Sequence, residues 1–273
     1  MWWRHDRPGQ FVCASYPRCD PSILSLVYIL QAQNLVKRYA GRTVVDEVSF
    51  DVGEGEIVGL LGRNGAGKTT SFRIAIGMIT PEAGRIIFNG QDVSKLAMYQ
   101  RARRGMGYLS QEPSVFQRLS VEQNLMAILE TRANLTRHEQ KRRAKHLIQQ
   151  FDLTRNRAQQ ARTLSGGERR KLEIARALIT EPSLVLLDEP FNGVDPMAVE
   201  DLQREISRLR DQYQIAMLIT DHNVSRTLEA VDRGYIINEG NVVFSGTPRQ
   251  IINNDQVRQL YLGSTFKGDE FDE

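Results

Sequence analysis

The chain has 273 residues, 41% of them hydrophobic, so it can bury the core of one large α/β domain or of two smaller ones. Its net charge of +3 is a small excess and gives no reason to invoke a nucleic-acid partner. The longest apolar run, Ile23 to Leu30, is too short to span a bilayer, so any membrane role must come through a partner. Cys13 and Cys19 favour free cytosolic thiols over a disulfide or a metal site.

Residues 1–27 are predicted to be a disordered extension, because they contain several prolines and show no hydrophobic period. A signal peptide is the alternative, since an arginine precedes an apolar patch, but no convincing cleavage site follows. The body is predicted to cover residues 28–266 and to end in a helix from Pro248 to Leu262, and residues 267–273 are predicted to form an acidic tail.

Two strands are predicted next, the first from Tyr28 to Tyr39 and the second from Val44 to Val52. Tyr39 ends the first strand. It is either an ordinary aromatic residue at a strand end or, because a phosphate-binding pattern follows, a platform on which a nucleotide base stacks.

A phosphate loop follows the apolar strand Ile57 to Leu61 and leads into a helix that opens at Lys68. Its pattern is G-x-x-x-x-G-K-[ST], in which glycines let successive N–H groups and the positive end of the helix point at a phosphate. Lys68 is expected to reach the β- and γ-phosphates of a nucleotide, and the Thr69 hydroxyl to bind Mg²⁺. The loop consists of Gly62, Arg63, Asn64, Gly65, Ala66, Gly67, Lys68, Thr69 and Thr70.

Beyond the first helix, the segment Gly84 to Gly90 indicates an antiparallel edge strand, and a further strand begins at Met106 and breaks at Gln111. At the end of a parallel core strand the Gln111 amide could contact metal or water; elsewhere it would be an ordinary turn residue. Residues from about 115 to 178 are then predicted to be a helical insertion, with capping boxes at two helix starts and a basic helix that is interpreted as solvated surface.

A second anion-binding helix start is predicted at Ser165, Gly166 and Gly167. Ser165 and Glu168 form a capping box, which alone would mean only a well-started helix. The hydroxyl, the bare backbone N–H groups and the helix dipole would also suit a phosphate.

Two carboxylates end the buried strand that begins at Leu184. Adjacent acids at a strand exit are costly unless a cation offsets them, and adjacent strand residues point to opposite faces. We therefore assign Asp188 to the metal and Glu189 to the attacking water. His222, at the end of the last core strand, is a candidate sensor of the γ-phosphate.

Together these motifs resemble the ordered motif set of the nucleotide-binding subunits of ABC transporters, over about residues 28–263. The resemblance implies an α/β P-loop NTPase (ABC ATPase) core with a parallel sheet, an antiparallel β edge and a helical insertion. It also implies ATP and Mg²⁺ as ligands and a head-to-tail homodimer that sandwiches two ATP molecules.

The same resemblance implies a role for each motif residue. Tyr39 would stack on adenine, and Gln111 would link metal and water to a membrane partner. Ser165 and Gly167 would contact the γ-phosphate held by the other protomer. Glu189 would be the general base, and His222 would orient the γ-phosphate and the water.

Several further segments resemble the lipopolysaccharide-export members of that family, including the ones around Phe116 and at Gly193-Val194-Asp195-Pro196. That resemblance implies transmembrane permease subunits docked near Phe116 and a cytoplasmic location at the face of the inner membrane. The alternative for Phe116 is that it is a buried core residue. Asn192 departs from the usual alanine. The alternatives are an ATPase of another transporter, such as a branched-chain amino-acid importer, and a soluble ABC ATPase acting on DNA or ribosomes.

Overall fold

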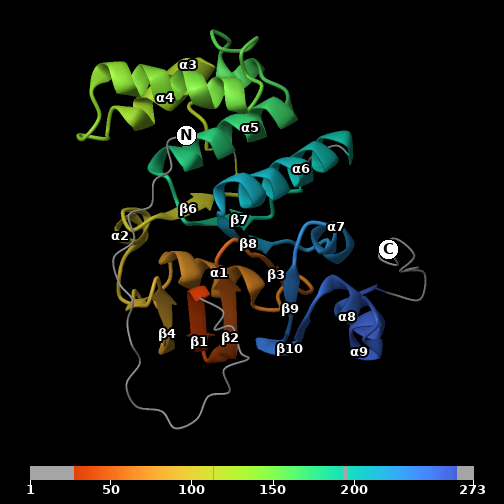
Figure 1. Cartoon of the computed structure of the whole chain (residues 1–273). Helices are drawn as coiled ribbons and strands as arrows, with labels where there is room; N and C mark the ends of the chain where they lie inside the picture. Colours follow the sequence, from red (N-terminus) through yellow and green to blue (C-terminus); the bar gives the residue numbers. More distant parts are fainter. Residues whose placement is uncertain (1–27, 113, 193–195, 263–273) are drawn as a thin grey trace, which may run out of the picture.

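The computed structural model describes residues 28–112, 114–192 and 196–262, arranged in layers (Figure 1). The predicted extension 1–27, the acidic tail 267–273 and Asp195 lie outside the described residues. Within the described part of the chain, no helix is long and apolar enough to cross a membrane.

The first layer is an antiparallel sheet of four strands in the order β2-β1-β4-β5. These are β1 (Tyr28–Tyr39), β2 (Arg42–Gly53), β4 (Ala83–Phe88) and β5 (Gln91–Asp92). Ala40 and Gly41 turn the chain between β1 and β2 with φ of 47° and 80°. The antiparallel β structure predicted from the sequence is therefore present as a separate sheet, in which β4 is paired on both sides and is not an edge strand.

The second layer is a six-stranded sheet in the order β10-β9-β3-β8-β7-β6. Its strands are parallel except for the β9–β10 pair. Every residue of β3, β7 and β8 is buried, as expected for parallel strands covered on both faces. The strands are β3 (Ile57–Leu61), β6 (Met106–Leu109), β7 (Leu184–Asp188), β8 (Ala216–Thr220), β9 (Arg233–Asn238) and β10 (Asn241–Gly246).

Helix α1 (Lys68–Ile76) packs between the two sheets, whereas α5 (Gly166–Ala177) and α6 (Pro196–Tyr213) cover the other face of the six-stranded sheet (Figure 1). Alternating β3 residues divide the core accordingly: Val58 and Leu60 pack on the α1 side, Ile57 and Leu61 on the α5 side. Helices α3 (Val121–Leu129) and α4 (Arg137–Gln150) lie above α5 and complete the helical layer.

The remaining helices are short. They are α2 (Met98–Ala102), η1 (Ala161–Thr163), η2 (Leu178–Thr180), α7 (Val224–Leu228), α8 (Pro248–Ile252), α9 (Asp255–Val257) and η3 (Arg258–Leu262). The single helix expected from Pro248 to Leu262 is wrong, because the chain breaks it at Asn253 and restarts it with Asn254 as a new N-cap.

Arg101 is the largest fully buried side chain of the described residues. Its guanidinium donates to the carbonyls of Ile74 and Ala75 at 2.8 and 2.6 Å, at the end of α1, and to those of Leu96 and Ser94. Burial lowers the pKa of Arg101 to about 10. A buried cation therefore supplies hydrogen-bond donors to the carbonyls at the C-terminus of the helix that follows the phosphate loop, where intrahelical N–H donors are lacking.

Candidate active site

The phosphate loop joins β3 to α1 through backbone conformations that need glycine. Gly62 has φ 149°, and a Cβ there would lie 2.2 Å from the carbonyl oxygen of Ile237. Gly67, the N-cap of α1, has φ 105°, and a Cβ there would lie 2.6 Å from the carbonyl oxygen of Val44. Larger residues at these two positions would force neighbouring backbone apart, so the sequence pattern corresponds to a real steric requirement.

Lys68 lies at the start of α1 with its ammonium folded across the loop. Its Nζ donates to the carbonyl of Gly62 at 2.6 Å and to that of Arg63 at 2.9 Å, and the residue is only 5% exposed. Burial lowers the pKa of Lys68, and the charges of Glu189 and Asp221 oppose that shift. A buried cation in this place is suited to an anionic ligand.

The other loop residues frame the cradle. Arg63, Asn64 and Gly65 are exposed, and Thr69 and Thr70 are partly buried in the first turn of α1. Tyr39 is 45% exposed at the end of β1. The carbonyl of Val44 on β2 lies close to Gly67, so the turn between β1 and β2 is near the phosphate loop. Tyr39 comes directly before this turn, and its ring is accessible for stacking.

The backbone at Asp188 and Glu189 differs from the continuous strand that the sequence predicted. Asp188 ends the strand and is 4% exposed, and burial, followed by the nearby charge of Glu189, raises its pKa. Glu189 has φ 44° and is no longer a strand residue, while its N–H donates to the carbonyl of Thr220 at 2.7 Å. The two side chains are thus separated by a left-handed backbone turn, and the argument from strand alternation was wrong.

The carboxylate of Glu189 contacts side chains from two distant segments and from its own loop. Its Oε2 accepts from Nε2 of Gln111 at 2.9 Å and from Nδ2 of Asn192 at 3.1 Å, and it lies 3.6 Å from Nδ1 of His222. The structure therefore brings together Gln111, Glu189 and His222, as the sequence motifs predicted. Asn192 was noticed in the sequence only as a departure, yet its amide contacts the candidate base.

A second buried acid, Asp221, was not predicted as part of the site. It is 1% exposed, its Oδ1 accepts from the N–H of Asn223 at 2.9 Å, and this oxygen lies 3.4 Å from Nδ1 of His222. Burial raises the pKa of Asp221. The available signal was an acid directly after the fully buried strand β8, the same pattern that identified Asp188.

A buried ion pair on α5 fixes the segment around Gln111. Arg170 donates to Glu173 at 2.9 Å and to the carbonyl of Ser110 at 3.0 Å. The other carboxylate oxygen of Glu173 accepts from the N–H of Ser114 at 2.9 Å. The backbone is held on both sides of Gln111, which explains why its amide reaches Glu189.

Ser165, Gly166 and Gly167 are not brought to the phosphate loop of the same chain. They begin α5, which packs on the face of the six-stranded sheet opposite α1. Ser165 caps the helix as predicted, with its Oγ accepting from the N–H of Glu168 at 3.3 Å. A Cβ on Gly166 would meet nothing within 4 Å, so this helix start is open to an external group.

Phe116 lies between the Gln111 segment and α3, and its side chain is 46% exposed. Its backbone is fixed by Asn124, whose Oδ1 accepts from the N–H of Phe116 at 2.8 Å. The guanidinium of Arg176 on α5 lies 4.7 Å from the centre of the ring. The alternative that Phe116 is a buried core residue is therefore wrong.

Comparison with known proteins agrees with this geometry. The family model described as "ABC transporter" matches residues 45–192. The chain is 49% identical over 239 residues to the lipopolysaccharide export system ATP-binding protein LptB of Haemophilus influenzae, covering 88% of this chain and 99% of that one. It is 50% identical to LptB of Escherichia coli strain K12, covering 87% and 98%.

A solved structure of MJ1267, an ATP-binding cassette of an ABC transporter, superposes with a TM-score of 0.79 at 25% identity, over 87% of this chain and all of that one. The layered arrangement of the two sheets and the helices is therefore that of an ABC cassette. The chain belongs to the family of ABC transporter ATP-binding proteins and is an ABC-type ATPase.

Proposed function

We propose that this chain is the ATP-hydrolysing subunit that drives lipopolysaccharide export from the inner membrane towards the outer membrane. The observation that carries this proposal is the similarity at 49–50% identity along 98–99% of the LptB proteins of two bacteria. Such similarity extends beyond the ATP-binding motifs shared by all cassettes, and it includes the region around Phe116 that would meet a membrane subunit.

In the proposed chemistry Glu189 is the general base for a water that attacks the γ-phosphorus of ATP. Its 17% exposure leaves the carboxylate partly accessible to water, while Gln111 and Asn192 hold it through two amide hydrogen bonds. His222, next to the same oxygen and to Asp221, orients the γ-phosphate and the water. The phosphate loop and Lys68 hold the β- and γ-phosphates, and Tyr39 stacks on the adenine.

The side chains present also fit Mg²⁺ bound together with the nucleotide. Asp188 is a buried carboxylate with a raised pKa, so a cation beside it would relieve the cost of its charge. In the described part of the chain no cluster of three acidic, histidine or cysteine residues could hold a metal alone. Thr69, Asp188 and Gln111 would therefore supply oxygen ligands alongside phosphate oxygens and water, as Mg²⁺ prefers, and the ion would neutralise phosphate charge.

We further infer a head-to-tail homodimer. Ser165, Gly166 and Gly167 are exposed or partly exposed at the start of α5, on the far side of the sheet from their own phosphate loop. A second copy can place this helix start against the γ-phosphate, where its N–H groups and dipole stabilise the anion. Each ATP would then be held between two chains, with the helical subdomain of residues 115–178 carrying the second half of the site.

The proposed membrane partners are two permease subunits of the LptF/LptG type, docked near Phe116. The exposed ring lies next to the Gln111 segment, so a docked permease helix and the candidate base are linked through few residues. By this proposal the protein acts at the cytoplasmic face of the inner membrane without spanning it.

Co-expression with the LptF/LptG-type subunits of the same organism tests the proposal. We expect a detergent-stable membrane complex that contains two copies of this chain and one of each permease, and that hydrolyses ATP. A well-folded chain that neither co-purifies with these permeases nor forms an ATP-dependent dimer in their presence would contradict it.

A further inference from the structure

The carboxylate of Asp221 lies at the candidate active site without a role of its own in the chemistry proposed so far. Asp221 directly follows β8 and is 1% exposed. Thr220, the residue before it, pairs with Leu60 of β3 on one side and with Asp188 of β7 on the other. Asp221 therefore leaves the sheet between the strand that leads to the phosphate loop and the strand that ends at the proposed metal ligand.

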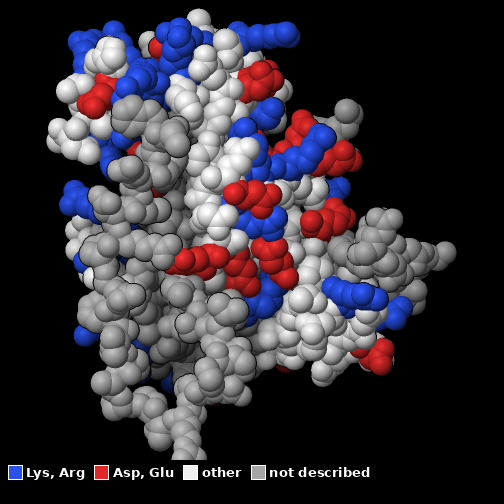
Figure 2. Space-filling view, in the orientation of Figure 1, with Lys and Arg blue, Asp and Glu red and all other residues white. Residues whose placement is uncertain are grey.

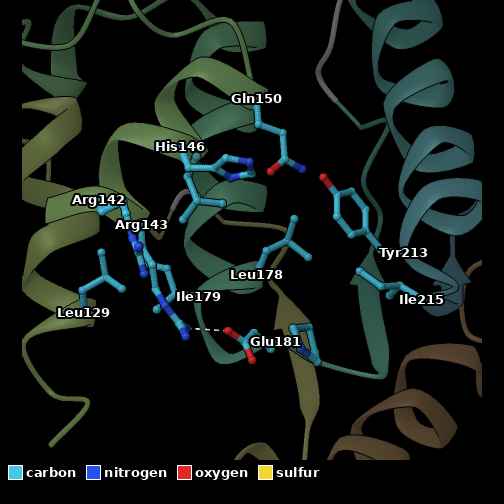
Figure 3. A pocket seen from close by; sticks show the side chains of 12 residues that line it. Leu129, Arg142, Arg143, His146, Gln150, Leu178, Ile179, Glu181, Tyr213 and Ile215 are labelled. Atoms are coloured by element: carbon cyan, nitrogen blue, oxygen red, sulfur yellow. Dashed lines mark hydrogen bonds and ion pairs between the residues drawn. The ribbon is translucent and has the colours of Figure 1, made fainter. Parts of the chain in front are cut away.

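A cavity in the helical layer does not reach this edge of the sheet. Figure 3 shows it between α4, η2 and the end of α6, and two of its lining residues, Pro182 and Ile215, precede β7 and β8. Its Arg143 is paired with Glu181. Figure 2 shows further Lys and Arg side chains gathered over the part of the molecule where α3 and α4 lie. The cationic partners of Asp221 are therefore to be sought among its own neighbours, at the carboxyl ends of the strands.

The loop around Asp221 satisfies its carboxylate only in part. Oδ1 accepts from the N–H of Asn223 at 2.9 Å, whereas Oδ2 is buried and has no hydrogen-bond partner among the described residues. Burial raises the pKa of Asp221, while the N–H of Asn223 and then the charge of His222 oppose that shift. Because a buried carboxylate is costly unless it is paired, a hydrogen-bond donor on the adjacent imidazole would be stabilised here.

His222 presents one ring nitrogen to two carboxylates. Its Nδ1 lies 3.4 Å from Oδ1 of Asp221 and 3.6 Å from Oε2 of Glu189. We assign a hydrogen to Nδ1, because a nitrogen that faces two carboxylate oxygens is stabilised as a donor and would be repelled as an acceptor. Nε2 is then the nitrogen that can meet the γ-phosphate, and the 44% exposure of the side chain leaves the ring accessible to a ligand.

Asp221 is better placed than Glu189 to hold the ring. Oε2 of Glu189 already accepts from the amides of Gln111 and Asn192, at 2.9 and 3.1 Å. Oδ1 of Asp221 accepts from a backbone N–H and is the closer of the two oxygens to Nδ1. Contacts between catalytic groups commonly shorten once substrate binds, so a small rotation of the ring would turn the approach of 3.4 Å into a hydrogen bond.

We propose that Asp221 is a positioning residue for ATP hydrolysis, which accepts a hydrogen bond from Nδ1 of His222 and thereby directs Nε2 at the γ-phosphate. The two acids then divide the work: Asp221 serves the imidazole, and Glu189 serves the attacking water. The inference rests on the role proposed above for His222, and it does not depend on the transported cargo.

Lys68 is the alternative partner of Asp221. Burial lowers the pKa of Lys68, and the charges of Glu189 and Asp221 oppose that shift, so the two groups interact through the phosphate site. If Asp221 acted chiefly through Lys68, its loss would weaken ATP binding rather than hydrolysis. The dissociation constant of ATP therefore distinguishes the two roles.

A double-variant cycle on the full chain tests the proposal. Asp221→Asn keeps the size of the side chain but removes its charge, and we expect kcat for Mg-ATP hydrolysis to fall about tenfold while Kd for ATP changes less than about threefold. His222→Ala alone should lower kcat about a hundredfold. The double variant should match His222→Ala within about twofold, because Asp221 acts only through the ring.

Asn223→Ala is the matched control in the same loop. It keeps the backbone N–H that donates to Asp221 and removes a side chain that serves α7 instead, where its Oδ1 accepts from the N–H of Arg226 at 3.2 Å. Its kcat should stay within about twofold of the parent value. Melting curves accompany every variant, and Asp221→Asn should not melt below the parent chain, because it removes a buried charge.

A kcat of Asp221→Asn within about twofold of the parent value, or a further loss of about tenfold when it is added to His222→Ala, would overturn the proposal. So would a weakening of ATP binding as large as the loss of kcat, or an equal loss of kcat in Asn223→Ala. Hydrolysis at the parent rate by His222→Ala is a distinct result, which would overturn the role of His222 together with this inference. Should Asp221→Asn fail to fold, Asp221→Ser takes its place in the same cycle.

Discussion

Replacing Phe116 with alanine separates a docking residue from a core residue. The ring is 46% exposed, and a fully exposed phenylalanine side chain presents about 200 Å². Roughly 90 Å² thus remains to be covered by a partner, which at about 25 cal/mol per Å² contributes ~2 kcal/mol to docking. The expected loss of affinity for the permease subunits is therefore about thirtyfold.

The expected effect on the fold is smaller. The covered side of the ring contacts Arg176, and a cation–π contact of this kind contributes about 0.5–1 kcal/mol. With the partial burial added, Phe116→Ala should lower the free energy of unfolding by about 1–2 kcal/mol and the melting temperature by about 2–8 °C. Nucleotide binding should be unchanged, because Phe116 does not contact the phosphate loop.

The assay measures the affinity of the purified chain for permease subunits held in nanodiscs, with melting curves and nucleotide titrations on the same samples. Phe116→Tyr is the matched control, since it keeps the ring and its contact with Arg176, and it should bind within about threefold of the parent chain. Undiminished assembly of Phe116→Ala would refute docking through this ring, and a collapsed melting temperature would show that the residue is mainly structural.

Further predictions concern catalysis, binding, folding and the N-terminus. Glu189→Gln should slow ATP hydrolysis by about two to four orders of magnitude while ATP still binds, as judged by phosphate release and nucleotide titration; hydrolysis at the parent rate would exclude Glu189 as the base. Lys68→Ala should weaken ATP binding itself, and an unchanged dissociation constant would contradict the role given to its ammonium. Arg101→Leu should lower the free energy of unfolding by about 3–5 kcal/mol in a denaturant titration, because buried carbonyls at the end of α1 lose a donor. Arg103→Leu, at an exposed position, should lower it by less than about 0.5 kcal/mol. Equal losses in the two variants would contradict this prediction. Deletion of residues 1–26 should leave the melting temperature and ATPase activity within error, and a clear loss of either would show that the segment packs on the body.

The elements that could be predicted from the sequence are those set by local pattern. The β3 strand, the glycines at 62 and 67 and the capping box at Ser165 each follow from residue type and short spacing, and the structure contains all of them. The end of the chain was less predictable. The helix expected beyond Pro248 breaks at Asn253, because a side chain that caps a new helix competes with continuation of the old one.

Contacts that depend on the folded backbone could not be predicted in the same way. The buried pair Arg170–Glu173 reads in the sequence as an ordinary charged helix face, yet in the structure it holds the backbone on both sides of Gln111. Asn192 contacts Glu189 because Glu189, directly after β7, has a positive φ, and no residue type near Glu189 predicts this conformation. Such features depend on tertiary packing and become visible only in three dimensions.

ATP-driven release of lipopolysaccharide tests the proposed function most directly. The chain is reconstituted with the proposed LptF/LptG-type permease subunits in liposomes that contain lipopolysaccharide, and extraction from the bilayer to an external acceptor is measured with and without ATP. We predict extraction that requires ATP and that is lost in the Glu189→Gln chain although the complex still assembles. An assembled complex that hydrolyses ATP without extracting lipopolysaccharide, or that extracts it equally well with the Glu189→Gln chain, would contradict the proposal.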